Sequence, residues 1–209
     1  QPGTQQDPLS GYASYYSKDN ERALPGYYEV LLKTHRTKVE LTASDRVAFH
    51  RYTFPKDVEK HVMINLKDAN GDDRPTDTYL EQINDTVIRG YRYSTGWSKK
   101  QQIYFSAVFS QPVHLTLYHD SVQVAGNRLQ GLDVKGNVAV APVVEELGVK
   151  VGISPVSMEN AMDNIGQEIK DWNFENIVAE TTGKWNAELS KLQVETTDTV
   201  AKRIFYTAL

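Results

Sequence analysis

The stretch from Gly26 to Pro55, GYYEVLLKTHRTKVELTASDRVAFHRYTFP, decides the fold of this chain. Apolar residues alternate with polar ones over 28–32 and again over 39–43, and a third run passes through Val47 and Phe49. Successive side chains leave opposite faces of an extended chain, so this alternation predicts half-buried strands. Turn-prone residues separate the three runs. The stretch therefore predicts two or three consecutive antiparallel strands.

Short runs of the same kind continue as far as residue 153. They lie at 62–66, 79–83, 86–93, 103–109, 113–118, 122–124, 137–140 and 149–153. The charged segment 17–22 and the segment DANGDDRPTD at 68–77 are expected to be loops, and residues 1–10 a loop or a frayed end. Roughly ten short strands with frequent turn signals favour a mainly antiparallel β-sandwich over a parallel α/β fold.

After Pro155 the apolar spacing changes from two residues to that of a helix. One apolar stripe has spacings of four, three, four and three, and consists of Met158, Met162, Ile165, Ile169 and Trp172. Ser157 precedes it as a candidate N-cap. Two further stripes begin at Phe174 and Val200. We therefore expect a β-sandwich domain over residues 1–153, whose first strands could precede Gln1, and two or three helices within residues 154–209.

Composition narrows the possible functions only slightly. The formal net charge of −4 and the mixed signs along the chain give no reason to expect nucleic acid as a partner. The chain has no cysteine, which excludes thiolate metal sites and cysteine nucleophiles. No apolar run approaches the roughly 18 residues that span a bilayer, and the first residues do not resemble a signal peptide.

Motifs that carry chemistry are scarce. The five histidines have no metal-binding spacing, so no metal site is predicted. Asp68, Asn70 and Asp72 resemble the start of a calcium loop, but Asp73 and Tyr79 occupy the positions that require Gly and Glu. A solvated loop is the better interpretation. No pair of carboxylates is distinguished by its context, so no catalytic residue is predicted.

Aromatic residues provide one candidate for substrate binding. Tyr91, Tyr93, Trp97 and Tyr104 cluster in RGYRYSTGWSKKQQIYF. Most such side chains pack on sheets and against neighbouring strands. Only Trp97 lies in an evident loop, and we predict it as a possible wall of a substrate cleft.

Four collinear segments, PGYYEVLL, VELTASDRVAFHRYTFP, SMENAMDNI and RIFYTAL, resemble the glycoside hydrolase family 92 exo-α-mannosidases. The resemblance extends over most of the chain from about Gly11. It implies an N-terminal sandwich of the galactose-mutarotase-like supersandwich type, followed by helices that lead into an (α/α)6 catalytic barrel absent from these 209 residues. It also implies a periplasmic or secreted bacterial protein.

In that family the general acid, the general base and most Ca²⁺ contacts belong to the barrel. The resemblance therefore implies a fragment without catalytic residues or cofactor, which packs on the barrel of the same polypeptide and forms part of a cleft for mannose-containing glycans. The parent would be a calcium-dependent, inverting α-mannosidase, and this chain alone should be inactive. Two alternatives stay open: a stand-alone carbohydrate-binding module, and a purely structural interaction domain.

Overall fold

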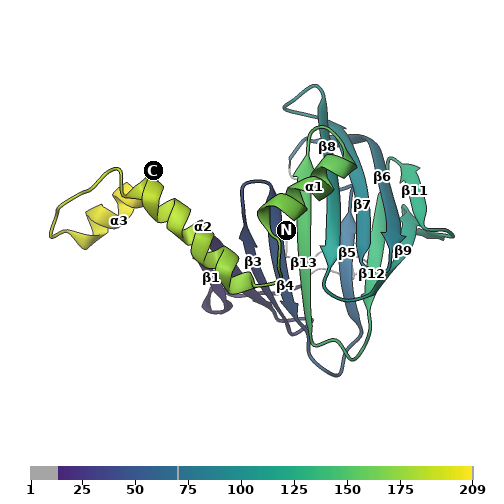
Figure 1. Ribbon diagram of the computed structural model, residues 1–209, viewed down its shortest axis with the longest axis horizontal. Helices are drawn as coiled ribbons and strands as arrows, with labels where there is room; N and C mark the ends of the chain where they lie inside the picture. Colours follow the sequence, from purple (N-terminus) through teal and green to yellow (C-terminus); the bar gives the residue numbers. More distant parts are fainter. Residues whose placement is uncertain (1–13, 70, 209) are drawn as a thin grey trace.

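The computed structural model describes residues 14–69 and 71–208, and within them the chain forms two antiparallel sheets packed face to face (Figure 1). The larger sheet has the strand order β1 (Glu21–Leu24), β2 (Tyr27–Leu32), β3 (Thr37–Ala43), β4 (Val47–Thr53), β13 (Glu146–Ser154), β8 (Gln101–Phe109), β7 (Val87–Thr95), β6 (Arg74–Asn84) and β11 (Arg128–Gly131). The smaller sheet has the order β10 (Val122–Val124), β9 (Val113–His119), β12 (Val134–Val140) and β5 (Lys60–Asn65). The predicted β-sandwich is confirmed.

The core fills the space between the two sheets. Its side chains come from alternate positions of the strands, because only one face of each pleated strand points inward. The most completely buried members, contributed by both sheets, are Leu80, Ile88, Leu117, Val134, Val138 and Leu147. The stretch that decides the fold supplies β2, β3 and β4, which pair in sequence order as predicted.

Two strands escaped the sequence analysis, and both lie at the edges of the larger sheet. β1 falls partly in the segment expected to be a charged loop, which also contains a short 3-10 helix at Lys18–Asn20. β11 carries no apolar alternation, since an edge strand such as this one is exposed on much of both faces. The loop predicted at 68–77 is also wrong in its second half, because β6 begins at Arg74 and pairs with β7 across a bulge next to Pro75.

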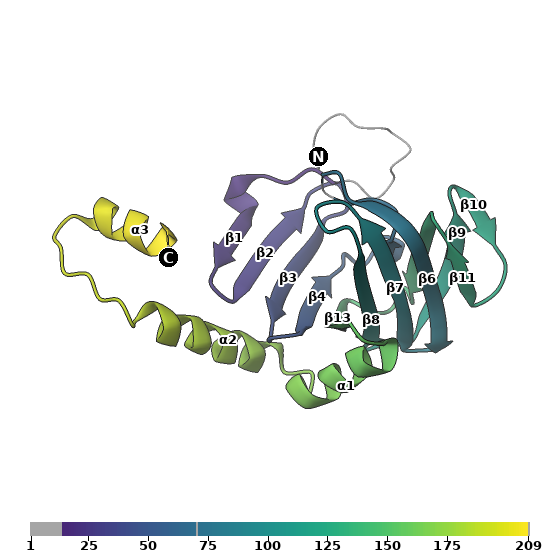
Figure 2. The same ribbon diagram turned by 90° about the horizontal axis from the view of Figure 1, so that it is seen from above.

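Three helices follow the sandwich, as predicted: α1 (Met158–Glu168), α2 (Phe174–Leu189) and α3 (Thr199–Ala208). Figure 2 shows α1 and α2 running along one side of the larger sheet, with α2 continuing outward to α3. No residue of α3 is buried. Trp172 does not extend the α1 stripe as expected, because α1 ends at Glu168 and Trp172 lies in the turn before α2. None of the described helices is long and apolar enough to cross a membrane.

Candidate functional site

The outer face of the larger sheet, turned away from the core, carries the helices α1 and α2. Ser157 caps α1 as predicted, with its Oγ accepting a hydrogen bond from the Asn160 N–H at 3.0 Å. A Cβ added at Gly152 of β13 would lie 2.1 Å from the Ala161 carbonyl oxygen. The hydroxyl of Ser106 donates to the Met158 carbonyl at 2.8 Å. α1 therefore lies directly against the backbone of β13, which only glycine permits at this position.

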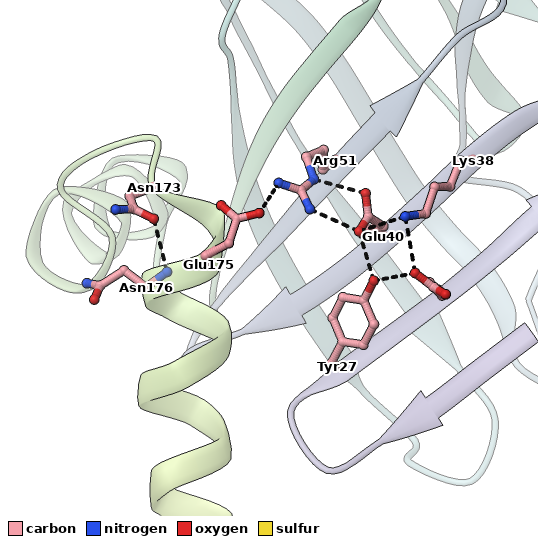
Figure 3. Close-up of polar contacts among 8 residues, drawn as sticks. Tyr27, Lys38, Glu40, Arg51, Asn173, Glu175 and Asn176 are labelled. Atoms are coloured by element: carbon pink, nitrogen blue, oxygen red, sulfur yellow. Dashed lines mark hydrogen bonds and ion pairs between the residues drawn. The ribbon is translucent and has the colours of Figure 1, made fainter.

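A network of charged groups joins β2, β3 and β4 beside the start of α2 (Figure 3). Arg51 of β4 makes two hydrogen bonds to the carboxylate of Glu40 on β3, of 3.0 and 2.9 Å. The hydroxyl oxygen of Tyr27 lies 2.8 Å from Glu40 and 2.5 Å from Glu29, and its single proton is shared between the two carboxylates. Lys38 forms ion pairs with both carboxylates. These groups face one another because residues opposite in adjacent strands share a face of the sheet.

The same arginine reaches from the sheet to α2. The guanidinium of Arg51 bonds Glu175 in the first turn at 2.5 Å, and it lies 4.3 Å from the centre of the Phe174 ring. Asn173 caps the helix through its Oδ1, which accepts from the Asn176 N–H at 3.0 Å. An acidic residue in the first turn also suits the positive end of the helix dipole. The network thus fixes where α2 starts and in which direction it leaves the sheet.

The environment of Glu40 keeps its carboxyl group ionised. Burial alone would raise its pKa, but the hydrogen bonds from Arg51, Tyr27 and Lys38 outweigh burial and lower the pKa to about 2. The pKa of Tyr27 is raised by burial and by its hydrogen bonds to the two glutamates. A carboxyl group held in this way cannot act as a general acid near neutral pH. The ionised carboxylates of this network hold the three strands and the start of α2 together.

Lys150 of β13 joins the sheet to the turn between α1 and α2. Its side chain is buried, and its Nζ donates to the Ile169 carbonyl at 3.0 Å and lies 4.2 Å from the Trp172 ring centre. Burial lowers the pKa of Lys150. The carbonyl at the end of α1 gains a cationic donor, which satisfies one of the unpaired groups of a helix C-terminus.

The aromatic residues of β6, β7 and β8 pack as the strand-pair interpretation predicts. The ring of Tyr91 stacks on Tyr93 at 4.4 Å and on Tyr79 at 5.5 Å, and Tyr104 meets Tyr93 edge-on at 5.7 Å. The Tyr91 hydroxyl donates to Asp77 at 2.9 Å. These half-buried tyrosines are committed to one another on the outer face of the sheet.

Trp97 lies in the loop between β7 and β8, and its side chain is fully exposed, at 105% of the reference area. The loop belongs to the end of the sandwich at which the helices begin, because Tyr104 of β8 pairs with Ser154, the last residue of β13. About 10 Å of extended strand separates residue 101 from this pair. Among the described residues, no side chain makes a hydrogen bond or a ring contact with Trp97. Its role as a cleft wall stays a prediction.

The described residues do not form a calcium or zinc site. No group of three His, Asp or Glu side chains among residues 14–69 and 71–208 could hold a metal ion. In the candidate calcium loop, the carboxylate of Asp68 accepts a hydrogen bond from Asn65, while that of Asp73 pairs with Arg92. Asn70 lies outside the described residues. The donors available in this part of the chain therefore do not fit Ca²⁺ coordination, which requires six or more converging oxygens.

Sequence reasoning missed Arg51, Glu40 and Lys150. Acidic and basic residues occur together on the neighbouring predicted strands, a signal that could have indicated cross-strand ion pairs. They are Glu29, Lys38, Glu40 and Arg51. The pairing of Arg51 with Glu175, 124 residues away, has no local signal. Lys150 has none either, since a lysine in a strand is usually solvated.

Comparisons with known proteins place the chain in a larger context. Residues 1–154 match the glycosyl hydrolase family 92 N-terminal domain, and residues 160–209 match the glycosyl hydrolase family 92 catalytic domain. No curated protein matches the chain.

Solved structures show the same relationship. The family GH92 alpha-mannosidase BT3965 from Bacteroides thetaiotaomicron superposes with a TM-score of 0.90 and 30% identity, over 99% of this chain and 29% of that one. Its complex with mannoimidazole gives 0.85 and 30%, over 93% and 27%. The gh92 family glycosyl hydrolase ccman5 gives 0.86 and 25%, over 99% and 29%. The chain therefore spans less than a third of the length of these relatives.

Proposed function

This chain belongs to glycosyl hydrolase family 92, and we propose that it is the non-catalytic sandwich and helical connection of a calcium-dependent α-mannosidase. The observation that carries the proposal is the pair of consecutive matches, to the family's N-terminal domain over residues 1–154 and to its catalytic domain over 160–209. The catalytic groups and the Ca²⁺ contacts would lie in the remainder of the polypeptide. We propose a periplasmic or secreted location on the same basis.

The attachments of α1 and α2 support a positioning role for the sandwich. The Arg51 network and Lys150 hold the start of α2 and the end of α1 against the sheet. α2 then extends away from the sheet (Figure 1). Any domain built on α2 and α3 takes its orientation from these contacts.

Trp97 is our candidate for direct contact with substrate. It lies at the end of the sandwich from which α1 departs, and its ring is free to stack on the apolar face of a sugar. The glycan in this proposal carries terminal α-mannose. The complex of BT3965 with mannoimidazole, a ligand of that relative, supports this substrate class.

Three measurements test the proposal. The chain alone should release no mannose from α-1,2-mannobiose, with or without Ca²⁺, because it lacks the paired acid and base that glycoside hydrolysis requires. In the complete polypeptide, chelation should abolish hydrolysis and added Ca²⁺ should restore it. Trp97→Ala should lower kcat/KM at least about fivefold, since a stacking contact contributes about 1 kcal/mol or more.

A matched control is Val143→Ala, which changes an exposed side chain (85%) in the turn at the opposite end of β13. It should leave kcat/KM unchanged. Mannose release by the chain alone would overturn the assignment of the catalytic groups to the remainder. Equal kcat/KM values for Trp97→Ala and the control would remove Trp97 from the cleft.

A further inference from the structure

The two sheets differ in width, so the smaller sheet covers only part of the larger one. Beside β5, the edge strand of the smaller sheet, a groove of about 720 Å³ opens against β3 and β4. Ligand pockets have volumes of roughly 300–1,000 Å³, so a groove of this size can enclose a small organic ligand. It runs along the edge of β5 onto the face of the smaller sheet that is turned away from the core, because Tyr118, Lys135 and Asn137 alternate with core residues of β9 and β12.

One wall of the groove is apolar and includes an aromatic platform. Val39, Tyr52 and Phe54 line it from the larger sheet, and the rings of Tyr52 and Phe54 stack at 6.2 Å with an angle of 23° between their planes. The Tyr52 hydroxyl is 2.8 Å from His50 Nδ1, which holds the ring in place. The rest of the lining comes from the smaller sheet and the turn after β9. There the polar side chains lie beside Val62 and Met63, and they include His61, Tyr118, Ser121, Lys135 and Asn137.

Two charged groups of the groove already have partners of opposite sign. Asp120 lies 3.6 Å from Lys67, and Lys135 lies 3.9 Å from Asp133. An ionic ligand would have to compete with these pairs and lose its own hydration. The charge distribution therefore favours a neutral ligand.

Asn137 adds a demand for a hydrogen-bond donor. Its side chain lines the groove, and its Oδ1 is buried without a hydrogen-bond partner among the described residues. A buried acceptor without a partner costs free energy that a ligand hydroxyl could recover. A purely apolar ligand could not supply this bond.

We propose that this groove is a binding site for a neutral carbohydrate, with the apolar face of a sugar ring on the Tyr52–Phe54 platform and its hydroxyls toward Asn137 and Ser121. Sugars combine an apolar face with a rim of hydroxyl donors, which matches the two walls. The site is distinct from Trp97. The groove is lined from the Tyr52 end of β4, which pairs with Leu147 at the start of β13, whereas Trp97 belongs to the Ser154 end.

The test is a titration of the isotopically labelled chain with α-1,2-mannobiose, followed by amide chemical shifts up to about 20 mM, above the ~1 mM Kd typical of a weak site. Shifts should concentrate at residues 34–39, 61–63, 118–121 and 135–137. Asn137→Leu should raise the Kd about tenfold, the effect of one lost hydrogen bond of roughly 1.4 kcal/mol.

Ser121→Trp provides a second variant, because Ser121 is exposed at the mouth of the groove and a bulky ring there blocks entry without disturbing the core. It should abolish the shifts while the spectrum otherwise stays folded. Trp97→Ala should leave the Kd unchanged, which separates this inference from the proposed function. Shifts confined to residues around Trp97, no shifts up to the highest concentration, or displacement of the sugar by lauric acid would each overturn the proposal.

Discussion

Replacing Glu40 by glutamine tests whether the Arg51 network stabilises the sandwich through a permanently ionised carboxylate. The pKa of Glu40 is about 2 in the folded chain, against an ordinary value of 4.5. A carboxyl group whose pKa is lower in the folded state contributes stability that is present above pH 4.5 and is lost as the pH falls toward 2. Here the contribution is roughly 3 kcal/mol at pH 7, and the same linkage leaves only about 1.4 kcal/mol at pH 3. The side chain of Glu40 is only 6% exposed, so solvent screening reduces this value little.

The assay is urea unfolding of the wild-type chain and of Glu40→Gln, followed by circular dichroism at both pH values. We expect wild type to be more stable at pH 7, and the gap to narrow by about 2 kcal/mol at pH 3, because the Glu40 carboxyl that titrates in this range is present only in wild type. Glu59→Gln, which changes a side chain that is 94% exposed, is the matched control and should follow wild type. Parallel curves for wild type and Glu40→Gln would refute the reasoning.

Three further predictions concern the helices. Gly152→Ala should destabilise the chain by about 3 kcal/mol or more, since its Cβ would meet the backbone of α1. Gly166→Ala is the control: a Cβ at this position of α1 has no atom within 4 Å, so thermal unfolding should show no destabilisation. The free energy of unfolding of wild type, relative to that of Lys150→Met, should rise as the pH increases toward 10.5. The pKa of Lys150 is lowered in the folded chain, so the folded chain binds this proton less tightly than the unfolded chain does. Urea titrations at several pH values measure the difference, and a difference that does not change with pH would contradict the prediction. In hydrogen exchange, amides of α3 should exchange with solvent within seconds to minutes while those of α1 stay protected, because an isolated helix of this length is marginal in water. Strong protection of the α3 amides would show that α3 packs on the sandwich.

The sequence predicted the parts of the fold that depend on local periodicity. β2, β3 and β4 follow from alternation, and the N-cap of α1 from Ser157. β1 and β11 could not be predicted in this way, because an edge strand is stabilised by backbone pairing with one neighbour and needs no apolar face. Local pattern is informative where a face is buried and weak where it is not.

Features that depend on strand order were inaccessible to sequence reasoning. The contact of Arg51 with Glu175 spans 124 residues, and the groove beside β5 exists only because the two sheets have different widths. The loop position of Trp97 could be predicted because a tryptophan in a polar segment differs from its surroundings, whereas its role stays a prediction. Lys150 could not, because its burial results from Trp172 and the end of α1 packing over it.

The helices that pack on the sandwich extend past the residue at which the second family match begins. The match to the catalytic domain begins at residue 160, yet α1 and the first half of α2 are packed on the sheet. The Thr181 hydroxyl donates to the Ala43 carbonyl at 2.7 Å, and Lys184 pairs with Asp45 at 2.9 Å. Gly26, with a φ of +84°, approaches the backbone of α2 so closely that a Cβ would lie 3.0 Å from Thr182 N.

Among the described residues, none after Lys184 makes a hydrogen bond or ion pair to the sheet, and apolar side chains become exposed. Trp185, Leu192, Val200 and Ile204 are all at least half exposed, and they lie on the arm that extends from the sheet (Figure 2). Apolar groups in such number on an extended arm mark a surface for further contacts. The first half of α2 thus belongs physically to the sandwich, and the second half, with α3, offers the apolar surface on which the proposed catalytic remainder would assemble. The packed half and the exposed half of α2 form one continuous helix. The contacts of Arg51 and Lys150 therefore also set the orientation of the proposed catalytic remainder that would pack on the exposed half.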